Sequence, residues 1–244
     1  MPAIIVIPAR LAAMRFPNKP LADIHGSPMI VHVWRRAIES GIGPVVVACG
    51  DRAIADAIDA VGGRAVMTDP DLPSGSDRVH AALAMADPMG RHDIVVNLQG
   101  DLPLMDPKLP GRLTRLMEDP QVDIGTLATP IHSQAELNRP SFVKVAIEPH
   151  ADGQSGRALY FSRVAIPSGE GEHLHHIGLY VFRRAALDRF VSLPPAVIER
   201  REGLEQLRAM AAGMRIDVAL IDDPVFGVDT PEDLELARQR MAPR

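Results

Sequence analysis

Short β-branched runs alternate with amphipathic helical patterns over the first hundred residues, and this alternation constrains the fold more than any other feature of the sequence. The first run, Ile4–Ile7, is apolar throughout, as expected of a strand that is buried on both faces of a parallel sheet. The predicted strands cover residues 4–7, 44–48, 65–67 and 93–98, and the predicted helices cover 29–40, 51–61 and 76–85. This order predicts an α/β protein with an open, mostly parallel sheet and helices on its faces. Ligands of such sheets bind at the carboxyl ends of the strands, so we look for functional residues just after each strand.

The pattern becomes richer in strands after about residue 120. Strands are predicted over residues 124–131, 143–148, 159–161, 177–182 and 215–221, and helices over 199–212 and 231–241. The chain contains no internal repeat, low-complexity tract or long Gly/Ser linker. We therefore expect one domain over residues 1–244, with a first half of about 1–120 and a strand-rich second half of about 121–244.

The composition disfavours several classes of protein. The 244 residues include 26 Lys+Arg and 31 Asp+Glu, a formal net charge of −5, whereas a dedicated nucleic-acid-binding protein usually has a basic excess. No apolar run approaches the roughly 18 residues of a membrane helix, and Arg10 interrupts the apolar stretch that a signal peptide would need. The single cysteine, Cys49, cannot form an internal disulfide. We expect a cytoplasmic protein with no membrane segment and no nucleic-acid partner.

The loop after the first predicted strand is cationic. It contains Arg10, Arg15 and Lys19, and no acidic residue occurs before Asp23. Charged hydrogen bonds from such groups are worth roughly 1.5–3 kcal/mol each where water is excluded, so the loop suits a polyphosphate. The G-x-G-x-x-G and G-x-x-x-x-G-K-[ST] patterns are absent, which disfavours a nicotinamide dehydrogenase and a P-loop ATPase. The alternative is an exposed basic loop that makes surface ion pairs.

Two aspartates are candidates for a metal site. Asp101 follows a predicted buried strand in the sequence Gln-Gly-Asp, where the alternative is a simple turn aspartate. Asp229 precedes a helix start in which Thr230 is the expected N-cap, Pro231 the first helical residue and Asp233 the capping-box partner. Two carboxylates facing a triphosphate would repel it unless a divalent cation lay between them. The pair therefore points to Mg²⁺, which favours one or two carboxylates plus phosphate oxygens.

Further polar segments extend the candidate site. Ser74 to Arg78 lies in a strand-to-helix loop, where it offers backbone donors near a helix N-terminus, another cation, and Ser76 as a cap. In the second half Arg163 is suited to pair with a carboxylate. Adjacent His175 and His176 would face opposite sides of a strand, which disfavours a zinc site there.

These segments together resemble the 3-deoxy-manno-octulosonate (Kdo) cytidylyltransferase family. The family's patterns I-P-A-R, R-x-P-x-K-P-L, S-G-[ST]-[DE]-R, Q-G-D, A-L-Y-F-S-R, H-I-G-[IL]-Y, L-E-Q-L-R and G-V-D-T-P-E-D-L occur in this order. They are matched at residues 7–10 and 15–21, then at 74–78, 99–101, 158–163, 176–180, 204–208 and 227–234. The first and last patterns alone would indicate only a sugar nucleotidyltransferase, whereas the whole series is specific.

The resemblance implies a Rossmann-like nucleotide-diphospho-sugar transferase fold with a mostly parallel, mixed sheet, and the reaction of CTP with Kdo to give CMP-Kdo and pyrophosphate for lipopolysaccharide biosynthesis. It is also compatible with a homodimer. The implied nucleotide-binding residues are Ala9, Arg10, Arg15, Lys19, Ser74, Gly75, Arg78 and Asp101. The implied sugar-binding residues are Gln99, Arg163, His176, Tyr180, Glu205 and Gln206. Asp101 and Asp229 would hold Mg²⁺, and these two with Arg10 and Lys19 form the implied catalytic set.

Two alternatives stay open. The chain departs from the family's usual residues at Ala13, Met14, Asn18, Leu72, Leu102, Ser141 and Ser168. A cytidylyltransferase for another ulosonic or sialic-type acid is therefore one alternative. The other is a nucleotide-binding regulatory protein that has lost turnover, although binding alone would not require both Asp101 and Asp229.

Overall fold

The computed structural model describes residues 1–12 and 16–242, and the chain divides into two compact units. Met1–Gly111 and Val225–Arg244 form the first unit, and Arg112–Pro224 forms the second. The last segment of the chain thus groups with the first half, although the sequence pattern had placed it in the second half. The expectation of a single domain over residues 1–244 stays a prediction. Arg15, Ala13 and Met14 lie outside the described residues.

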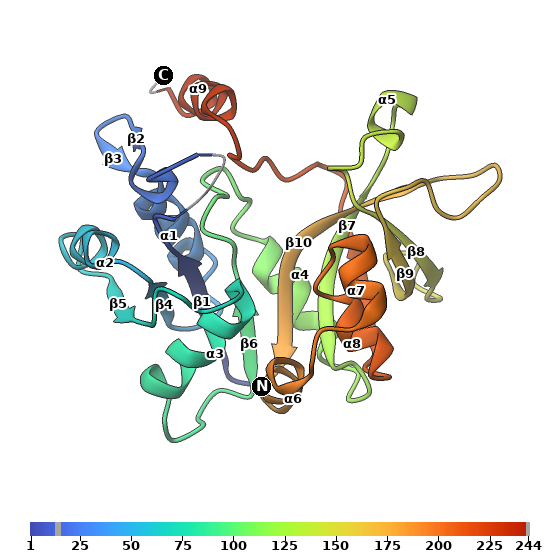
Figure 1. Ribbon diagram of the computed structural model, residues 1–244, viewed down its shortest axis with the longest axis horizontal. Helices are drawn as coiled ribbons and strands as arrows, with labels where there is room; N and C mark the ends of the chain where they lie inside the picture. The colour runs from blue at the N-terminus through green and yellow to red at the C-terminus, as the bar shows by residue number, and fades with distance from the viewer. Residues whose placement is uncertain (13–15, 243–244) are drawn as a thin grey trace. The chain divides into compact units, whose positions relative to one another are not determined.

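The first unit is built on parallel strands, as the alternation predicts. Strand β1 (Ala3–Ala9) pairs in parallel with β4 (Val45–Cys49) on one side and with β6 (Ile94–Asn97) on the other. Strand β5 (Arg64–Met67) pairs in parallel with β4 (Figure 1). Ile4 to Ile7 are at most 1% exposed, so the central strand is buried on both faces, as its continuous apolar run requires.

Helices and a small hairpin complete the first unit. The helices are α1 (Met29–Glu39), α2 (Arg52–Asp59), α3 (Gly75–Ala86) and α9 (Pro231–Arg240), the short 3₁₀ turn η1 covers Lys19–Leu21, and the hairpin consists of β2 (Asp23–Ile24) and β3 (Ser27–Pro28). Helix α4 (Leu109–Leu116), which the sequence pattern did not predict, begins at the end of this segment. A buried cluster of Ile24, Met29, Val228, Leu234 and Ala237 packs α9 against β2 and the start of α1. This packing places the C-terminal segment next to Phe16 and Ala22, which follow β1 in the chain.

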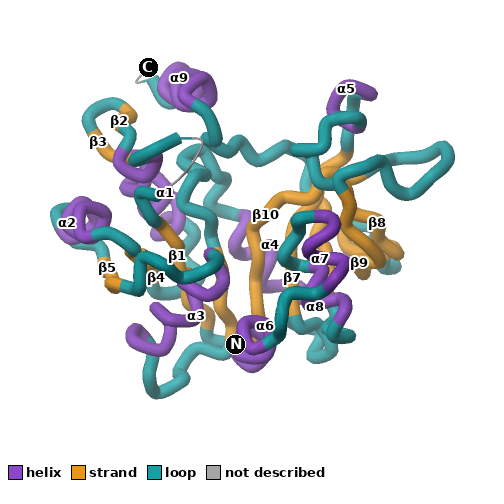
Figure 2. Tube along the Cα trace, viewed as in Figure 1, coloured by secondary structure: helices purple, strands orange, loops and turns teal. Residues whose placement is uncertain are grey.

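The second unit contains five strands with both parallel and antiparallel pairing. They are β7 (Ile124–Pro130), β8 (Lys144–Pro149), β9 (Ser155–Ser162), β10 (Leu174–Arg183) and β11 (Ile216–Leu220). Figure 2 shows strands in orange, β7 to β10 among them. Strand β7 is parallel to β11 and antiparallel to β10, and β9 is antiparallel to both β11 and β8. A short antiparallel contact between β8 and the start of β10 closes the five strands into a ring. The predicted mixed sheet is confirmed, with parallel pairing in the first unit and mainly antiparallel pairing in the second.

The helix predicted over residues 199–212 is wrong. The segment forms two helices, α7 (Val197–Glu202) and α8 (Leu207–Ala211), because Gly203 adopts a left-handed conformation with φ 64° and ends α7. The remaining helices of this unit are α5 (Gln134–Leu137) and α6 (Arg184–Ser192). As a result Glu205 and Gln206 lie in a connection between helices. No helix in the described part of the chain is both long and apolar enough to cross a membrane.

Candidate functional site

A cavity of about 420 Å³ lies in the first unit, where the loops following β1 and β6 meet the N-terminus of α3 and the segment before α9. The strand-end rule predicted a site at this edge of the sheet. The cavity is lined by every predicted nucleotide- or metal-binding residue that the structure describes, together with Gln99. These residues are Ala9, Arg10, Lys19, Ser74, Gly75, Arg78, Gln99, Asp101 and Asp229.

Lys19 joins the two predicted metal-binding aspartates. Its Nζ lies 2.8 Å from Asp101 Oδ2 and 3.2 Å from Asp229 Oδ1. Burial alone would lower the pKa of Lys19, but the charges and hydrogen bonds of the two aspartates outweigh it and the pKa is raised. The preceding Asn18 takes the left-handed conformation (φ 59°), which asparagine tolerates better than most residues. The two carboxylates therefore converge on one cationic position.

Backbone contacts hold Asp229 beside Asp101. The N–H of Val228 donates to the carbonyl oxygen of Asp101 at 2.9 Å. Thr230 caps α9 by accepting from the Asp233 N–H, and Asp233 accepts in return from the N–H of Thr230. The capping box expected from the sequence is confirmed, and it leaves the side chain of Asp229 directed to the cavity.

Arg10 and Arg78 differ in their surroundings. Arg10 is exposed in the cavity lining and has no ion-pair partner among the described residues. Arg78 is 2% exposed and donates to Thr68 Oγ1 (2.6 Å) and to the carbonyl oxygens of Asp69 (2.9 Å) and Pro70 (3.0 Å). Burial and the charge of Arg10 lower the pKa of Arg78. Arg78 thus holds the loop before α3, and its contact with a nucleotide stays a prediction.

The N-terminus of α3 is capped by Ser74, and the expectation that Ser76 is the cap is wrong. Ser74 is extended, and its Oγ accepts from the N–H of Asp77 at 3.2 Å and donates to Asp77 Oδ2 at 2.7 Å. Ser76 is a buried residue inside the helix. The helix begins at Gly75, one residue earlier than the sequence pattern indicated, so its first N–H groups lie in the segment that lines the cavity.

The donor set fits a magnesium ion that is completed by a substrate. Asp101 and Asp229 provide two carboxylates at a common cationic position, and Mg²⁺ combines one or two carboxylates with phosphate oxygens and water. Within residues 1–12 and 16–242 no group of three or more His, Cys, Asp or Glu side chains forms a metal cage. A cation bound here would therefore depend on oxygens from a ligand.

In the second unit His176 and Tyr180 lie close together on β10, with ring centroids 5.5 Å apart. Burial lowers the pKa of His176 to about 3, so its ring is neutral. The Thr126 hydroxyl lies 3.0 Å from His176 Nε2 and faces the carbonyl oxygens of Ile177 and Leu179. The Nε2 of His176 therefore shares a hydrogen bond with the Thr126 hydroxyl, and the tautomer of the ring decides which of the two donates.

The connection between α7 and α8 brings further predicted sugar-binding residues to β10. Burial and the nearby charge of Glu205 raise the pKa of Tyr180 well above its ordinary value. Gln206 is 5% exposed, and its buried Nε2 has no hydrogen-bond partner among the described residues. An unpaired buried amide is costly, so Gln206 is suited to receive a polar ligand.

Arg163, at the end of β9, already makes several contacts within its own unit. Its guanidinium donates to the carbonyl oxygens of Glu202 (2.7 Å), Pro140 (3.0 Å) and Gly203 (3.0 Å). The expected pairing of Arg163 with a sugar carboxylate stays a prediction. Sequence reasoning missed Thr126 and Glu202, because neither lies in a motif and both act on residues far away in the chain.

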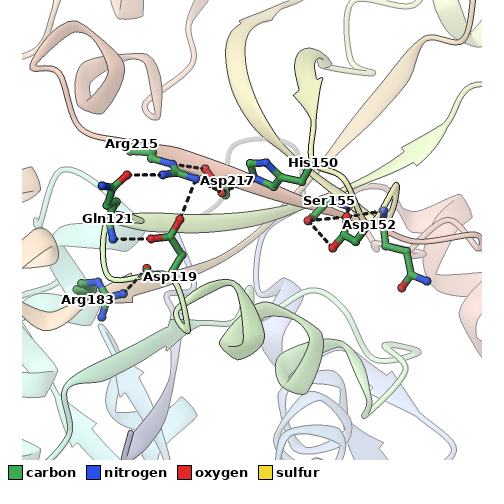
Figure 3. A network of polar contacts seen from close by, with 9 residues as sticks. Asp119, Gln121, His150, Asp152, Ser155, Arg183, Arg215 and Asp217 are labelled. Carbon is green, nitrogen blue, oxygen red and sulfur yellow. Dashed lines mark hydrogen bonds and ion pairs between the residues drawn. The ribbon is translucent and has the colours of Figure 1, made fainter.

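A second cavity, of about 510 Å³, lies in the second unit and is lined largely by charged side chains. Asp217 accepts from Arg215 Nε through Oδ1 at 2.9 Å (Figure 3). The Nε2 of His150 lies 2.8 Å from Oδ2 of the same aspartate. Arg215 also lies 3.1 Å from Asp119, and Asp152 accepts from the backbone and hydroxyl of Ser155. Arg215, Asp217, His150 and Asp119 thus already contact one another, and the geometry of these residues gives no comparable indication of a ligand.

Comparisons with known proteins show similarity to cytidylyltransferases. The family model described as cytidylyltransferase matches residues 4–216. The 3-deoxy-manno-octulosonate cytidylyltransferase of Paramagnetospirillum magneticum is 57% identical over 96% of both chains. The enzyme of the same name from Rhodospirillum centenum is 59% identical over 99% of this chain and 94% of its own.

A solved structure of CMP:2-keto-3-deoxy-manno-octonic acid synthetase complexed with CTP is 41% identical, with a TM-score of 0.89 over 98% of both chains. A cytidylyltransferase from Leptospira borgpetersenii has a TM-score of 0.62 at 16% identity, covering 98% of this chain and 85% of its own, which shows similarity of fold alone. The predicted α/β fold with flanking helices is confirmed.

Proposed function

The chain belongs to the 3-deoxy-manno-octulosonate cytidylyltransferase family, and we propose that it transfers CMP from CTP to Kdo with release of pyrophosphate. The observation that carries the proposal is the convergence of Lys19, Asp101 and Asp229 in a cavity that Arg10 also lines. Cations and carboxylates in one cavity suit a triphosphate and its counter-ion, and the family's reaction requires both. This product would supply a lipopolysaccharide pathway with activated Kdo.

The first unit would bind and orient the nucleotide. Arg10 and Lys19 provide positive charge in the cavity, and the first N–H groups of α3 line it next to Ser74 and Gly75. The anomeric hydroxyl of the sugar acid attacks the α-phosphorus, the bond to the bridging oxygen breaks, and pyrophosphate leaves with that oxygen. No covalent enzyme intermediate is needed, so the protein contributes mainly by holding the reactants in line and stabilising charge.

We propose that Asp101 and Asp229 hold Mg²⁺ during this reaction. The two carboxylates are suitable donors, and the ammonium of Lys19, which lies within 3.2 Å of both, supports a cation at this position. The ion would supply neutralisation of the phosphate charge. Lys19 is placed to contact the same phosphate oxygens once they replace the aspartates as its partners.

The second unit would recognise the sugar acid. The neutral ring of His176 offers a nitrogen that suits a sugar hydroxyl, and Gln206 offers an unpaired amide donor. Arg163 would bind the carboxylate with the guanidinium hydrogens that its carbonyl partners leave available. Tyr180 and Glu205 complete the proposed sugar-binding set of this unit, and Gln99 is its proposed member in the first unit.

We also propose a cytoplasmic location, because CTP is a cytoplasmic substrate and the buried Cys49 is a free thiol. Binding of a nucleic acid is not part of the proposal, since the chain is acidic overall. A homodimer stays a prediction, which sedimentation of the purified protein would test.

The function is tested by measuring pyrophosphate release with CTP, Mg²⁺ and a panel of sugar acids. We expect turnover with Kdo that stops when the cation is chelated. Turnover with a different ulosonic acid but not with Kdo would correct the substrate. CTP binding without turnover on any sugar acid would instead support a regulatory protein.

A further inference from the structure

Glu202, at the end of α7, joins two segments of the second unit that carry proposed sugar-binding residues. Its Oε1 accepts from the Ser162 hydroxyl at 3.0 Å, and its Oε2 accepts from the backbone N–H of Arg163 at 3.0 Å. Arg163 returns the contact, since its Nε donates to the carbonyl oxygen of Glu202 and its Nη2 to that of Gly203. The end of β9 and the end of α7 are thus bonded in both directions, an arrangement that we call the Glu202–Arg163 clamp.

Lys144 supports the same strand end from β8. Its side chain is fully buried, and its Nζ donates to the carbonyl oxygens of Arg139 at 2.8 Å and Arg163 at 3.1 Å. Arg163 is therefore held through its backbone N–H, its backbone carbonyl and its guanidinium. Such extensive bonding restricts its position far more than an exposed arginine side chain would be restricted.

The clamp controls the residues that follow Glu202 directly. Gly203 leaves the helix in the left-handed conformation, and Gln206 lies three residues later with its buried amide unpaired. Glu205 lies near enough to Tyr180 of β10 for its charge to affect that phenol. A shift at Glu202 would therefore move Gln206 and Glu205 relative to β10.

We propose that Glu202 is a positioning residue for the sugar acid, because its carboxylate fixes the end of β9 to the loop Gly203–Gln206. This inference rests on the proposed function and deepens it. Glu202 contacts Ser162 and Arg163 and acts on the sugar through Arg163 and Gln206. Glu202 therefore affects the affinity for the sugar acid, whereas the nucleotide is bound by residues of the first unit.

The first test is Glu202→Gln, which replaces one acceptor oxygen by an amide that points hydrogens at a donor. We expect the KM for Kdo to rise about tenfold, equivalent to about 1.4 kcal/mol, while the KM for CTP stays within about twofold. The matched control is Glu199→Gln in the same helix, whose carboxylate pairs with Arg208 at 2.6 Å. The control should lower the melting temperature and leave both KM values unchanged. An unchanged KM for Kdo in Glu202→Gln, or an equal rise in Glu199→Gln, would overturn the proposal.

A substrate-free measurement keeps this test separate from the proposed function. Hydrogen exchange at the N–H groups of Gly203 and Leu204, which donate to the carbonyl oxygen of Glu199, should become at least about tenfold faster in Glu202→Gln. Unchanged exchange would refute the clamp even if the enzyme is active. Absence of turnover by the wild-type protein would refute the proposed function, while faster exchange would still support the clamp. If Glu202→Gln does not fold, Ser162→Ala removes one clamp bond and should raise the same exchange rates and KM less strongly.

Discussion

Replacing Asp229 by asparagine should separate catalysis from stability. The change removes one negative charge from the cavity and leaves Lys19 its shorter contact, 2.8 Å, with Asp101. The lost ion pair joins side chains that are 15% and 55% exposed, so solvent screens it and its contribution is below about 1 kcal/mol. For a chain of this length, that corresponds to a fall of less than about 4 °C in melting temperature. The capping box of α9 stays intact, because Thr230 and Asp233 form it.

Activity should respond much more strongly to the same substitution. Loss of a group that stabilises charge in a transition state typically lowers kcat about 10²–10³-fold, and we expect a loss of this size in pyrophosphate release. Higher Mg²⁺ concentrations should restore part of the rate, since the remaining carboxylate still binds the cation weakly. The control is Glu232→Gln, which removes an exposed charge three residues away without changing the cavity lining. Near-normal turnover in Asp229→Asn, or a melting temperature lowered by about 10 °C or more (over twice the fall expected from the screened ion pair), would refute the reasoning.

Three further predictions concern packing, capping and pH. Gly50→Ala should destabilise the protein by about 1–3 kcal/mol and raise the KM for CTP, because a Cβ at this position would lie 2.9 Å from Arg78 Nη1. Equal KM values for CTP in the variant and the wild type would contradict this. Thr230→Ala should lower the free energy of unfolding by about 1 kcal/mol through loss of the cap on the Asp233 N–H, and an unchanged urea midpoint would exclude that role. The pKa of His176 falls from 6.5 to about 3 on folding, so the unfolded chain binds more protons between these values and acid lowers stability there. The fall in the urea midpoint between pH 7 and pH 5 should therefore be smaller in His176→Gln than in the wild type. A fall of the same size in both proteins would count against a buried neutral ring.

Local sequence patterns were sufficient to predict the parallel strands of the first unit and its helices α1, α2, α3 and α9. A run such as Ile4–Ile7 has no polar face, so it can satisfy its backbone and bury its side chains only inside a sheet that is covered on both sides. Asp229 was identified by a similar argument, since the capping box accounts for its neighbours and leaves it unexplained. The rule that strand ends share one edge of the sheet places Asp101 near the loop that carries Lys19. Asp229 reaches the same position because the segment before α9 packs against β2 and the start of α1.

The prediction failed where distant side chains compete for backbone groups. The helical periodicity runs through Gly203 without a break, yet α7 ends there and the guanidinium of Arg163 binds the carbonyl oxygens of Glu202 and Gly203. Arg163 lies about forty residues earlier, so no local window contains that competition. The structure adds a second role for Arg78, which lines the cavity and also donates to the carbonyl oxygens of Asp69 and Pro70, while its contact with a nucleotide stays a prediction.

The sequence by itself determined the α/β class, the succession of strands and helices along the first unit and the residue types at the cavity, because these depend on hydrophobic period, capping chemistry and strand ends. Only the tertiary structure decided which charges meet and which are already engaged. It brought Lys19 between Asp101 and Asp229, buried His176 as a neutral ring, and tied Arg163 to Glu202. The physical reason is that protonation and hydrogen-bond partners depend on distances and burial, which residues far apart in the chain create only when the chain folds.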